Sequence, residues 1–419
     1  METSGTKIGP LRRGRFFIFF FLYLLVYHVV VVNRLAPWSV NRLTYSVYRV
    51  DYSFGFGSKF LPGALFDLLF GQRTSEKATT IFCASLVVII FAGVSFLLER
   101  FMLRVRPENR NAALFTAVVF LSGSYTFCIY TRYLGLLDTW WLLFSILFLL
   151  FLENKRLRFL IPAVFVLSLL IHFSALVFII TFYSIVLLYR ISVAGTKRER
   201  SGLIAVLCVS LLLTAGLFMF LVLYESRHIV PMEEFHNKLL ERGESFFNYW
   251  DYSIFHIWEG KLFVPESVND IGNPLIKFAA LFYYQAKMAL GIVAGKPGRS
   301  IAVTLSALFL LLPPYLAAAR FHRRRCAGQT GALGRICSFL MIVQFPFVFC
   351  LGVLFGMGID MTRYLTHGFT VTCMCLLYVL YSDPEANEMF FEALRPLKGS
   401  MPTAVWFSAY FLTAMDPLF

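Results

Sequence analysis

Apolar residues come in long runs along this chain, and short clusters of charged residues separate the runs. A helix that crosses a membrane needs about 20 apolar residues, and many of these runs approach or reach that length. The predicted spans are 16–32, 79–98, 112–130, 139–152, 159–171, 173–189, 203–224, 301–319, 336–356 and 364–381. The pattern therefore predicts an all-α, polytopic transmembrane helical bundle of roughly 10–12 spans with outer interfacial helices, in which residues 1–419 form a single domain.

Two apolar segments do not fit this count. Segment 274–294 is nearly long enough to span, but Lys277, Gln285 and Lys287 make it amphipathic, so we expect an interfacial or re-entrant helix on the outer side. Segment 402–419 is short, and a partial span, an interfacial segment and a final crossing all stay open for it.

The short run 159–171 is followed at once by the run 173–189. We expect the two to form a broken or hairpin pair that turns at His172. Irregular backbone at membrane depth is tolerated only where protein buries it or where it lines a wet cavity. The turn at His172 is therefore a candidate position for function.

Composition and charge support the membrane class and exclude a nucleic-acid partner. Hydrophobic residues make up 58% of the chain and charged residues only 15%, whereas a soluble domain has about 25% charged residues. The net charge of +14 comes from basic clusters that follow the ends of apolar runs, around residues 7–15, 100–110, 155–158, 197–200 and 320–325. This positive-inside pattern predicts a multi-pass protein of the inner (cytoplasmic) membrane with a cytoplasmic N-terminus.

The basic N-terminal head precedes an apolar run without a small-x-small cleavage site, which predicts an uncleaved first span.

Several other features carry no sign of a cofactor. The eight cysteines form no zinc-type pairs, and His228 and His236 are too far apart in sequence for an ordinary metal site. No nucleotide-binding glycine motif is present. We therefore expect neither a metal nor a cofactor.

This topology predicts two large loops on the outer side, at 33–78 and 225–273. Both mix aromatic with charged residues, and each is too short to form an independent domain. We expect them to lie on the membrane surface and to cap the bundle.

Ionisable residues gather at the outer ends of the predicted spans, and charge at membrane depth is usually functional. A carboxylate or histidine could take a proton from an acceptor hydroxyl, and arginine could bind phosphate oxygens. Arg363 and His367 are four residues apart and would share one helix face. The candidate residues are Arg49, Asp51, Arg132, Asp138, His172, Arg227, Arg363, Tyr364 and His367.

Each candidate also has a purely structural interpretation. Arg132 and Asp138 could be anchors at the membrane interface, with the Arg132 side chain reaching to lipid headgroups. His172 could be a turn residue whose imidazole is satisfied by backbone carbonyl groups. Arg363 and His367 could simply cap and anchor the last span.

The run LGLLDTWWLLFSILFLLFLENKRLRF…LIHFSALVFI resembles the central part of bacterial envelope-polysaccharide membrane enzymes. These include EpsG-like and O-antigen-type polymerases and, more distantly, the GT-C class of glycosyltransferases. The resembling features are Asp138 at the start of a span, the basic hairpin Lys155, Arg156 and Arg158, the His-x-Ser-Ala-Leu element from His172, and Arg363-Tyr364 opening a late span. The first outer loop departs from many GT-C enzymes, because it offers only Asp51 instead of paired acidic residues.

The resemblance implies a polymerase or glycosyltransferase that uses a polyprenyl-phosphate- or pyrophosphate-linked sugar donor at the outer leaflet. Asp138 or Asp51 would orient or deprotonate the acceptor hydroxyl, with His172 and His367 as second candidates for proton transfer. The departing phosphate and the substrate would be bound by Arg132, Arg363, Arg49, Tyr364 and Arg227. The implied partners are membrane lipids, the lipid-linked glycan and other proteins of envelope biosynthesis.

Two other functions stay open. A transporter or flippase of lipid-linked or small anionic substrates also uses ionisable residues within the membrane. The third function is that of a non-catalytic assembly protein of the envelope. Transporters often show inverted repeats. No repeat stands out here, and the ionisable residues gather at one face, so the pattern favours an enzyme.

Overall fold

The computed structural model describes residues 14–71, 75–123, 126–228, 230–246, 265–295 and 361–394, with a few single residues between 316 and 340. Every regular element in these residues is helical, and they contain no strand. The all-helical prediction is therefore confirmed. The segments predicted at 301–319 and 336–356 and the tail 402–419 lie almost entirely outside the described residues.

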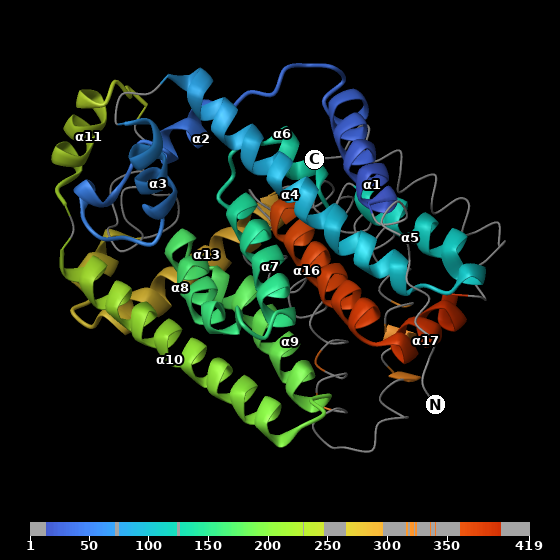
Figure 1. Cartoon of the computed structure of the whole chain (residues 1–419). Helices are drawn as coiled ribbons and strands as arrows, with labels where there is room; N and C mark the ends of the chain where they lie inside the picture. The colour runs from blue at the N-terminus through green and yellow to red at the C-terminus, as the bar shows by residue number, and fades with distance from the viewer. Residues whose placement is uncertain are drawn as a thin grey trace.

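Three helical segments are long and apolar enough to cross a membrane. The first is Arg15–Val32, formed by α1 (Arg15–Val26) and the π-helical turn η2 (Tyr27–Val32). The others are the long helices α4 (Glu76–Arg104) and α10 (Lys197–Arg227), which lie on different sides of the bundle in Figure 1. These three segments match predicted spans.

Between α4 and α10 lie α7 (Asp138–Glu153), α8 (Ile161–Ile171), α9 (Thr181–Ser192) and α16 (Met361–Ser382), whereas α5 (Arg110–Ser122) lies outside them, near α1 (Figure 1). Helix α7 packs closely on α4, where a Cβ on Gly93 would lie only 2.8 Å from the side chain of Ile146. Glycine at this position thus lets the two helices approach each other, as small residues do between membrane helices.

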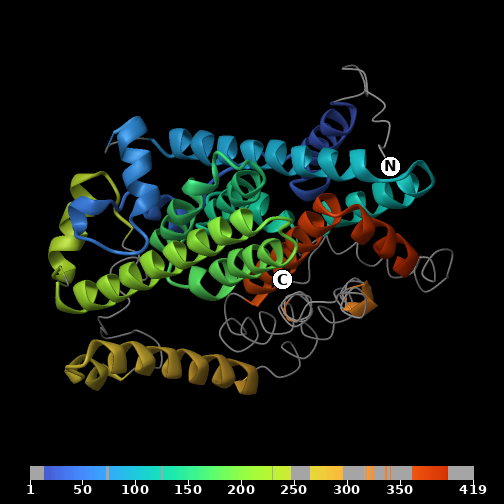
Figure 2. The ribbon, with the colours of Figure 1, turned by 60° about the horizontal axis from the view of Figure 1, so that its bottom comes forward.

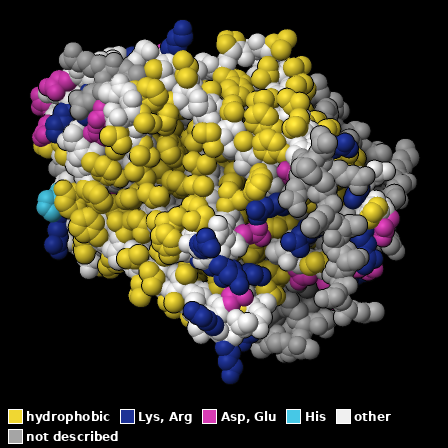
Figure 3. All heavy atoms as spheres, in the orientation of Figure 1, with side chains coloured by type: hydrophobic (Ala, Val, Ile, Leu, Met, Phe, Trp, Pro, Cys, Tyr) yellow, Lys and Arg dark blue, Asp and Glu magenta, His cyan; other side chains and the backbone are white. Residues whose placement is uncertain are grey.

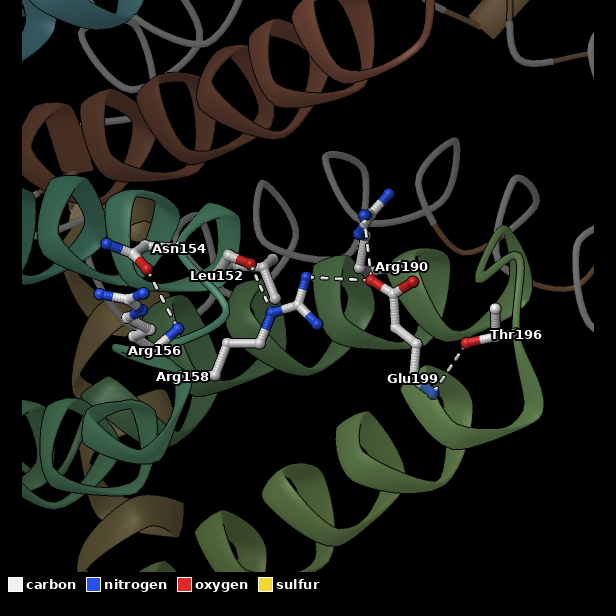
Figure 4. A network of polar contacts seen from close by, with 7 residues as sticks. All are labelled: Leu152, Asn154, Arg156, Arg158, Arg190, Thr196 and Glu199. Carbon is white, nitrogen blue, oxygen red and sulfur yellow. Dashed lines mark hydrogen bonds and ion pairs between the residues drawn. The ribbon is translucent and has the colours of Figure 1, made fainter.

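One end of the bundle, which we call the arginine end, gathers basic side chains around carboxylates. Glu199, near the start of α10, lies 3.1 Å from Arg158 and 3.2 Å from Arg190, and Arg158 also donates to the carbonyl of Leu152 (Figure 4). Further ion pairs at this end join Arg100 to Glu153 and Arg106 to Glu388 of α17 (Pro384–Leu394). Basic clusters that are far apart in the sequence therefore share one end.

The opposite end, which we call the loop end, carries short helices from the two predicted outer loops (Figure 1). These are α2 (Arg42–Val47), η3 (Tyr52–Phe54), α3 (Leu61–Phe70) and α11 (Met232–Glu241). The segments pack on each other through Phe54 and Phe235, whose ring centroids lie 4.8 Å apart. We call this unit, made of residues 42–70 and 230–246, the cap.

The prediction of one continuous span at 112–130 is wrong. Helix α5 ends at Ser122, the backbone of Gly123 is extended, and a separate short helix, α6 (Cys128–Arg132), follows. Polar groups satisfy the backbone at the break: Tyr27 donates to the carbonyl of Ser122, and Thr126 donates to that of Gly123. Such a break is tolerated inside an apolar bundle because its carbonyl groups find partners.

The predicted turn at His172 is confirmed. Helix α8 ends at Ile171, His172 is extended, and the π-helical turn η6 (Leu176–Ile180) leads into α9. Arg158, just before α8, and Arg190, near the end of α9, both reach Glu199. The two helices therefore run in opposite directions, and the turn lies at their other end.

The surface between the two ends is mainly apolar. Figure 3 shows hydrophobic side chains spread over this face, while most of the Lys and Arg side chains gather toward the arginine end. Exposed apolar residues on the long segments include Val26, Ile89 and Leu212. Apolar surface of this extent is typical of a face that contacts lipid.

Helix α13 (Pro274–Gly295) matches the amphipathic segment predicted at 274–294. It lies along the edge of the described structure (Figure 2), and Phe278 packs on Phe218 of α10 with ring centroids 5.4 Å apart. Its interfacial or re-entrant placement stays a prediction.

Candidate functional site

The bundle brings Asp138 and His367 together although they are far apart in the sequence. Asp138 is the first residue of α7, and His367 lies near the start of α16. Asp138 Oδ2 lies 3.0 Å from His367 Nε2, and the side chains are only 1% and 3% exposed. The contact has an ion-pair distance without the in-line geometry of a hydrogen bond.

The position of Asp138 at the start of α7 helps to accommodate its charge. The first N–H groups of a helix lack partners within the helix, and the helix dipole is positive at this end. A carboxylate here is therefore less costly to bury than one in the middle of a span.

The hydroxyl of Tyr130, on α6, contacts the other ring nitrogen of His367. Its oxygen lies 3.0 Å from His367 Nδ1, and Tyr130 is buried. If the phenol donates to Nδ1, a neutral imidazole carries its proton on Nε2, facing Asp138. Asp138, His367 and Tyr130 then form a buried chain of carboxylate, imidazole and phenol, which we call the acid–base set.

Trp141 joins the acid–base set to His172. Its ring centroid lies 5.4 Å from that of His367 and 6.1 Å from that of His172. The indole N–H donates to the carbonyl of Ser168, at 3.0 Å, which fixes the ring. His172 Nδ1 in turn lies 2.7 Å from the hydroxyl of Ser174. Two of the predicted proton-transfer candidates, His172 and His367, therefore lie against one tryptophan, and the third, Asp138, contacts His367.

Asp51, the fourth such candidate, lies in the cap. Its two carboxylate oxygens accept hydrogen bonds from Arg242 at 2.9 and 3.1 Å, and Oδ1 also accepts from the backbone N–H of Ser53. Burial raises the pKa of the Asp51 carboxyl, but the hydrogen bonds from Arg242 and Ser53 outweigh this, and the net pKa is lowered. Asp51 is thus a structural ion-pair partner in this arrangement.

Arg49 is buried beside the same ion pair. Its guanidinium lies over the ring of Tyr45, 4.7 Å from the centroid, and donates to the Tyr45 hydroxyl. Its backbone carbonyl accepts a hydrogen bond of 2.9 Å from Arg242. The sequence placed Arg49 and Asp51 with the catalytic candidates, whereas these contacts tie both residues to the cap.

One residue connects the cap to the neighbourhood of the acid–base set. The hydroxyl of Tyr48 donates to the carbonyl of Gly135 at 3.1 Å and accepts from the indole N–H of Trp140 at 3.2 Å. Gly135 lies in the turn between α6 and α7, and Trp140 lies two residues after Asp138. The cap is therefore hydrogen-bonded to the turn that precedes Asp138.

The remaining predicted residues have different positions. Arg132 is the last residue of α6 and lies near Tyr27, while Arg227 is exposed at the C-terminal end of α10. The side chains of Arg363 and Tyr364 lie outside the described residues, although the backbone of α16 includes both. Arg363 lies one helical turn before His367.

Tyr130, Trp141 and Arg242 are the residues that sequence reasoning missed. Tyr130 is the last residue of the predicted span 112–130, and Trp141 lies within the predicted span 139–152, where nothing in the sequence distinguished it from its apolar neighbours. The polar residues Thr131 and Arg132, directly after Tyr130, were the available signal that a polar turn follows the apolar run. Arg242 lies in a loop rich in charges, where no pattern singled it out.

Among the described residues, no cluster of three or more His, Cys, Asp or Glu side chains is arranged to hold a metal ion. Comparison of the chain with protein-family models, with curated proteins and with solved structures gives no match in any of the three.

Proposed function

We propose that this protein is an integral membrane enzyme of glycan assembly, which transfers or polymerises sugars from a polyprenyl-phosphate- or pyrophosphate-linked donor. The observation that supports this most is the buried contact of Asp138 with His367, since a paired carboxylate and imidazole are suited to proton transfer. Ionisable side chains inside an apolar bundle are expensive to keep and usually functional.

In this proposal the chain crosses the inner membrane roughly ten to twelve times. The arginine end faces the cytoplasm, because basic clusters there follow the positive-inside pattern. The loop end faces outward, and the acid–base set lies toward it, since Asp138 opens α7 and Glu153 closes it at the arginine end. A lipid-linked donor would reach this depth from within the bilayer.

The acid–base set suggests how the proton of the acceptor hydroxyl is removed. Asp138 faces Nε2 of His367, and with the imidazole proton on that nitrogen, Nδ1 is left as the proton acceptor. An acceptor sugar hydroxyl takes the place of the Tyr130 hydroxyl at Nδ1. Its oxygen attacks the anomeric carbon, its proton passes to Nδ1, and the bond from that carbon to the phosphate oxygen breaks. Asp138 then stabilises the imidazolium that forms.

The leaving group of this reaction is an anionic lipid phosphate or pyrophosphate. Arg132 follows Tyr130 and Thr131 on α6, and Arg363 precedes His367 by one turn of α16. Guanidinium groups bind phosphate oxygens through paired hydrogen bonds, so both are proposed to neutralise the leaving group. His172, which shares Trp141 with His367, is proposed as a substrate contact at the same site.

The test is a reconstitution of the purified protein in liposomes that contain a polyprenyl-pyrophosphate-linked oligosaccharide. Alanine substitutions at Asp138, Arg132, His172 and Arg363 should each reduce glycan transfer or shorten the polymer. The control is Glu233→Gln, which removes a carboxylate from the exposed face of α11 and should leave synthesis unchanged. Wild-type polymer length and amount in all four variants would exclude this function.

A proton-coupled transporter or flippase is the second candidate, and two observations favour it. A buried Asp–His pair is also typical of proton relays in transporters, and the helices are broken between α5 and α6 and again at His172. The same liposomes distinguish the two functions. Movement of the lipid-linked substrate across the bilayer, coupled to proton uptake and without new glycosidic bonds, would favour transport.

A further inference from the structure

His28 lies in the first apolar segment, on the π-helical turn η2, and its side chain is fully buried. Its Nδ1 lies 2.8 Å from the hydroxyl oxygen of Thr131 on α6. Its Nε2 has no hydrogen-bond partner among the described residues. The rings of Phe91 and Tyr27 lie against it, with centroids 4.8 and 5.6 Å away. The contact with Thr131 is therefore the hydrogen bond that fixes this imidazole.

Helix α6 is held between two histidines. Thr131 meets His28 of the first segment, and the preceding residue, Tyr130, meets His367 of α16. A helix of five residues is far too short to be stable alone, so tertiary contacts must set its position. A displacement of α6 at Thr131 would also move Tyr130 at the acid–base set.

The backbone around His28 is itself fixed by local contacts. Its carbonyl accepts hydrogen bonds from the side chain of Asn33 at 2.7 Å and from the Asn33 backbone N–H at 3.0 Å. The next residues, Arg34 and Leu35, have φ values of 51° and 60°, in the left-handed region. Turns of this kind and π-helical turns are costly, and they persist where the surrounding structure determines them.

The hydroxyl of Thr131 determines which group donates in its hydrogen bond with His28. Its oxygen also lies 3.2 Å from the carbonyl of Cys128, to which its single hydrogen can be donated. His28 then donates its Nδ1–H to Thr131 as a neutral imidazole. Loss of this hydrogen bond would leave both nitrogens of a buried ring without partners, which is costly.

We propose that His28 is a positioning residue for the acid–base set and acts through α6. Its hydrogen bond to Thr131 holds α6 in position. Helix α6 in turn positions Tyr130 against His367 and Arg132 near the leaving phosphate. This inference rests on the proposed function for its effect on activity, but its effect on His367 is independent of that function.

The test compares His28→Asn with His28→Leu in the full chain, labelled with ¹⁵N-histidine and embedded in lipid nanodiscs. The carboxamide of asparagine can donate from the position of Nδ1, whereas leucine cannot. His28→Leu should shift the ring ¹⁵N signals of His367, assigned among the seven histidines by their loss in His367→Gln. It should also lower kcat roughly 10- to 100-fold with little change in KM, because α6 carries Arg132, proposed to neutralise the leaving phosphate, and small misplacements of such a group are costly.

His28→Asn should restore both the His367 signals and most of kcat. His228→Asn is the matched control, because His228 is exposed at the end of α10 and should leave the His367 signals unchanged. If His28→Leu proves unstable, Thr131→Val removes the same hydrogen bond from the other side and should give the same shift. A His367 signal that does not move in either variant, or that moves equally in His28→Asn, would overturn the inference.

Activity separates this inference from the proposed function. If the His367 signals shift as expected but Asp138→Ala retains full glycan synthesis, the positioning role of His28 stands and the proposed function fails. If Asp138→Ala abolishes synthesis while His28→Leu leaves both the signals and kcat unchanged, the proposed function stands and the positioning role fails.

Discussion

Asp51 in the cap and Asp138 in the bundle are both buried carboxylates that face a nitrogen base, but the two partners differ. Asp51 is bound by the guanidinium of Arg242 through two hydrogen bonds. Arg242 is further held by the hydroxyl of Ser53 at 2.7 Å and lies over the ring of Phe54, 4.7 Å from its centroid. Asp138 instead faces the imidazole of His367 at one oxygen.

The difference decides which pair can exchange a proton. Arginine stays charged at every accessible pH, so the Asp51–Arg242 pair is fixed, and both carboxylate oxygens of Asp51 are occupied by Arg242. An imidazole can accept and release a proton, and among the described residues the hydrogen-bond partner of His367 Nδ1 is a phenol that a substrate hydroxyl could replace. Burial and pairing alone therefore do not identify a catalytic carboxylate; the partner and its remaining hydrogen-bonding capacity do.

The sharpest test of this contrast is the pair of variants Asp138→Asn and Asp51→Asn. Asp138→Asn should reduce the rate of glycan transfer about 10²- to 10⁴-fold, the usual contribution of general acid–base catalysis, while the protein stays folded. Asp51→Asn should reduce the amount of folded protein, with a nearly wild-type rate per folded molecule. The measurements are initial rates in proteoliposomes, normalised to the monodisperse fraction in size-exclusion chromatography.

Glu233→Gln provides the baseline for both variants, since Glu233 is an exposed carboxylate in the first turn of α11. A loss of rate in Asp51→Asn as large as that in Asp138→Asn would reverse the assignment and make Asp51 the proton acceptor.

The second largest effect is expected on stability. Arg242→Met leaves Asp51 buried without its cationic partner, and breaking a buried pair in this way costs about 3–5 kcal/mol. We expect a lower midpoint of thermal unfolding in detergent and faster proteolysis within the cap. Arg227→Met is the control, because Arg227 is exposed and its loss should change little.

The double variant Asp51→Leu/Arg242→Met sharpens the same test. It removes both charges at once and should recover part of the stability lost in Arg242→Met, because no unpaired charge is left behind. A double variant as unstable as the single one would mean that the lost packing on Phe54, rather than the unpaired charge, causes the effect.

The sequence predicted the parts of the fold that follow from local patterns. The apolar runs predict α4 and α10, and the short run that stops at His172 predicts the turn between α8 and α9. The break between α5 and α6 was missed because its stability depends on contacts from elsewhere. The donor to the carbonyl of Ser122 is Tyr27, which lies almost a hundred residues earlier.

The candidate site was predictable only in part, for a related reason. Charge placement singled out Asp138, His172 and His367; in the structure Asp138 contacts His367, and both histidines lie against Trp141. The same reasoning included Asp51, because a sequence shows that a carboxylate is near an apolar run but not what binds it. Arg242, which occupies both oxygens of Asp51, comes from the other outer loop.

A third prediction concerns the pH dependence of the cap. The folded pKa of Asp51 lies below the ordinary value of 3.8, so its ion pair contributes stability that is complete above that pH and is lost as the pH falls through the folded pKa. As the pH falls below 3.8, the unfolding midpoint of the wild type should therefore decrease by more than that of Asp51→Asn, which has no carboxyl to protonate. Equal slopes for the two proteins would show that other carboxylates dominate acid unfolding.

The smallest effect is expected for Tyr130→Phe. The variant keeps the buried ring and removes the hydroxyl at His367 Nδ1, so the lost hydrogen bond should cost about 1 kcal/mol of stability. If an acceptor hydroxyl replaces Tyr130 at this nitrogen during the reaction, the phenol takes no part in the chemistry and kcat should change much less than in Asp138→Asn. A drop in kcat as large as that of Asp138→Asn would instead make Tyr130 the group that passes the proton to His367. The acid–base set would then be a three-member relay, and its contrast with the fixed Asp51–Arg242 pair would become still greater.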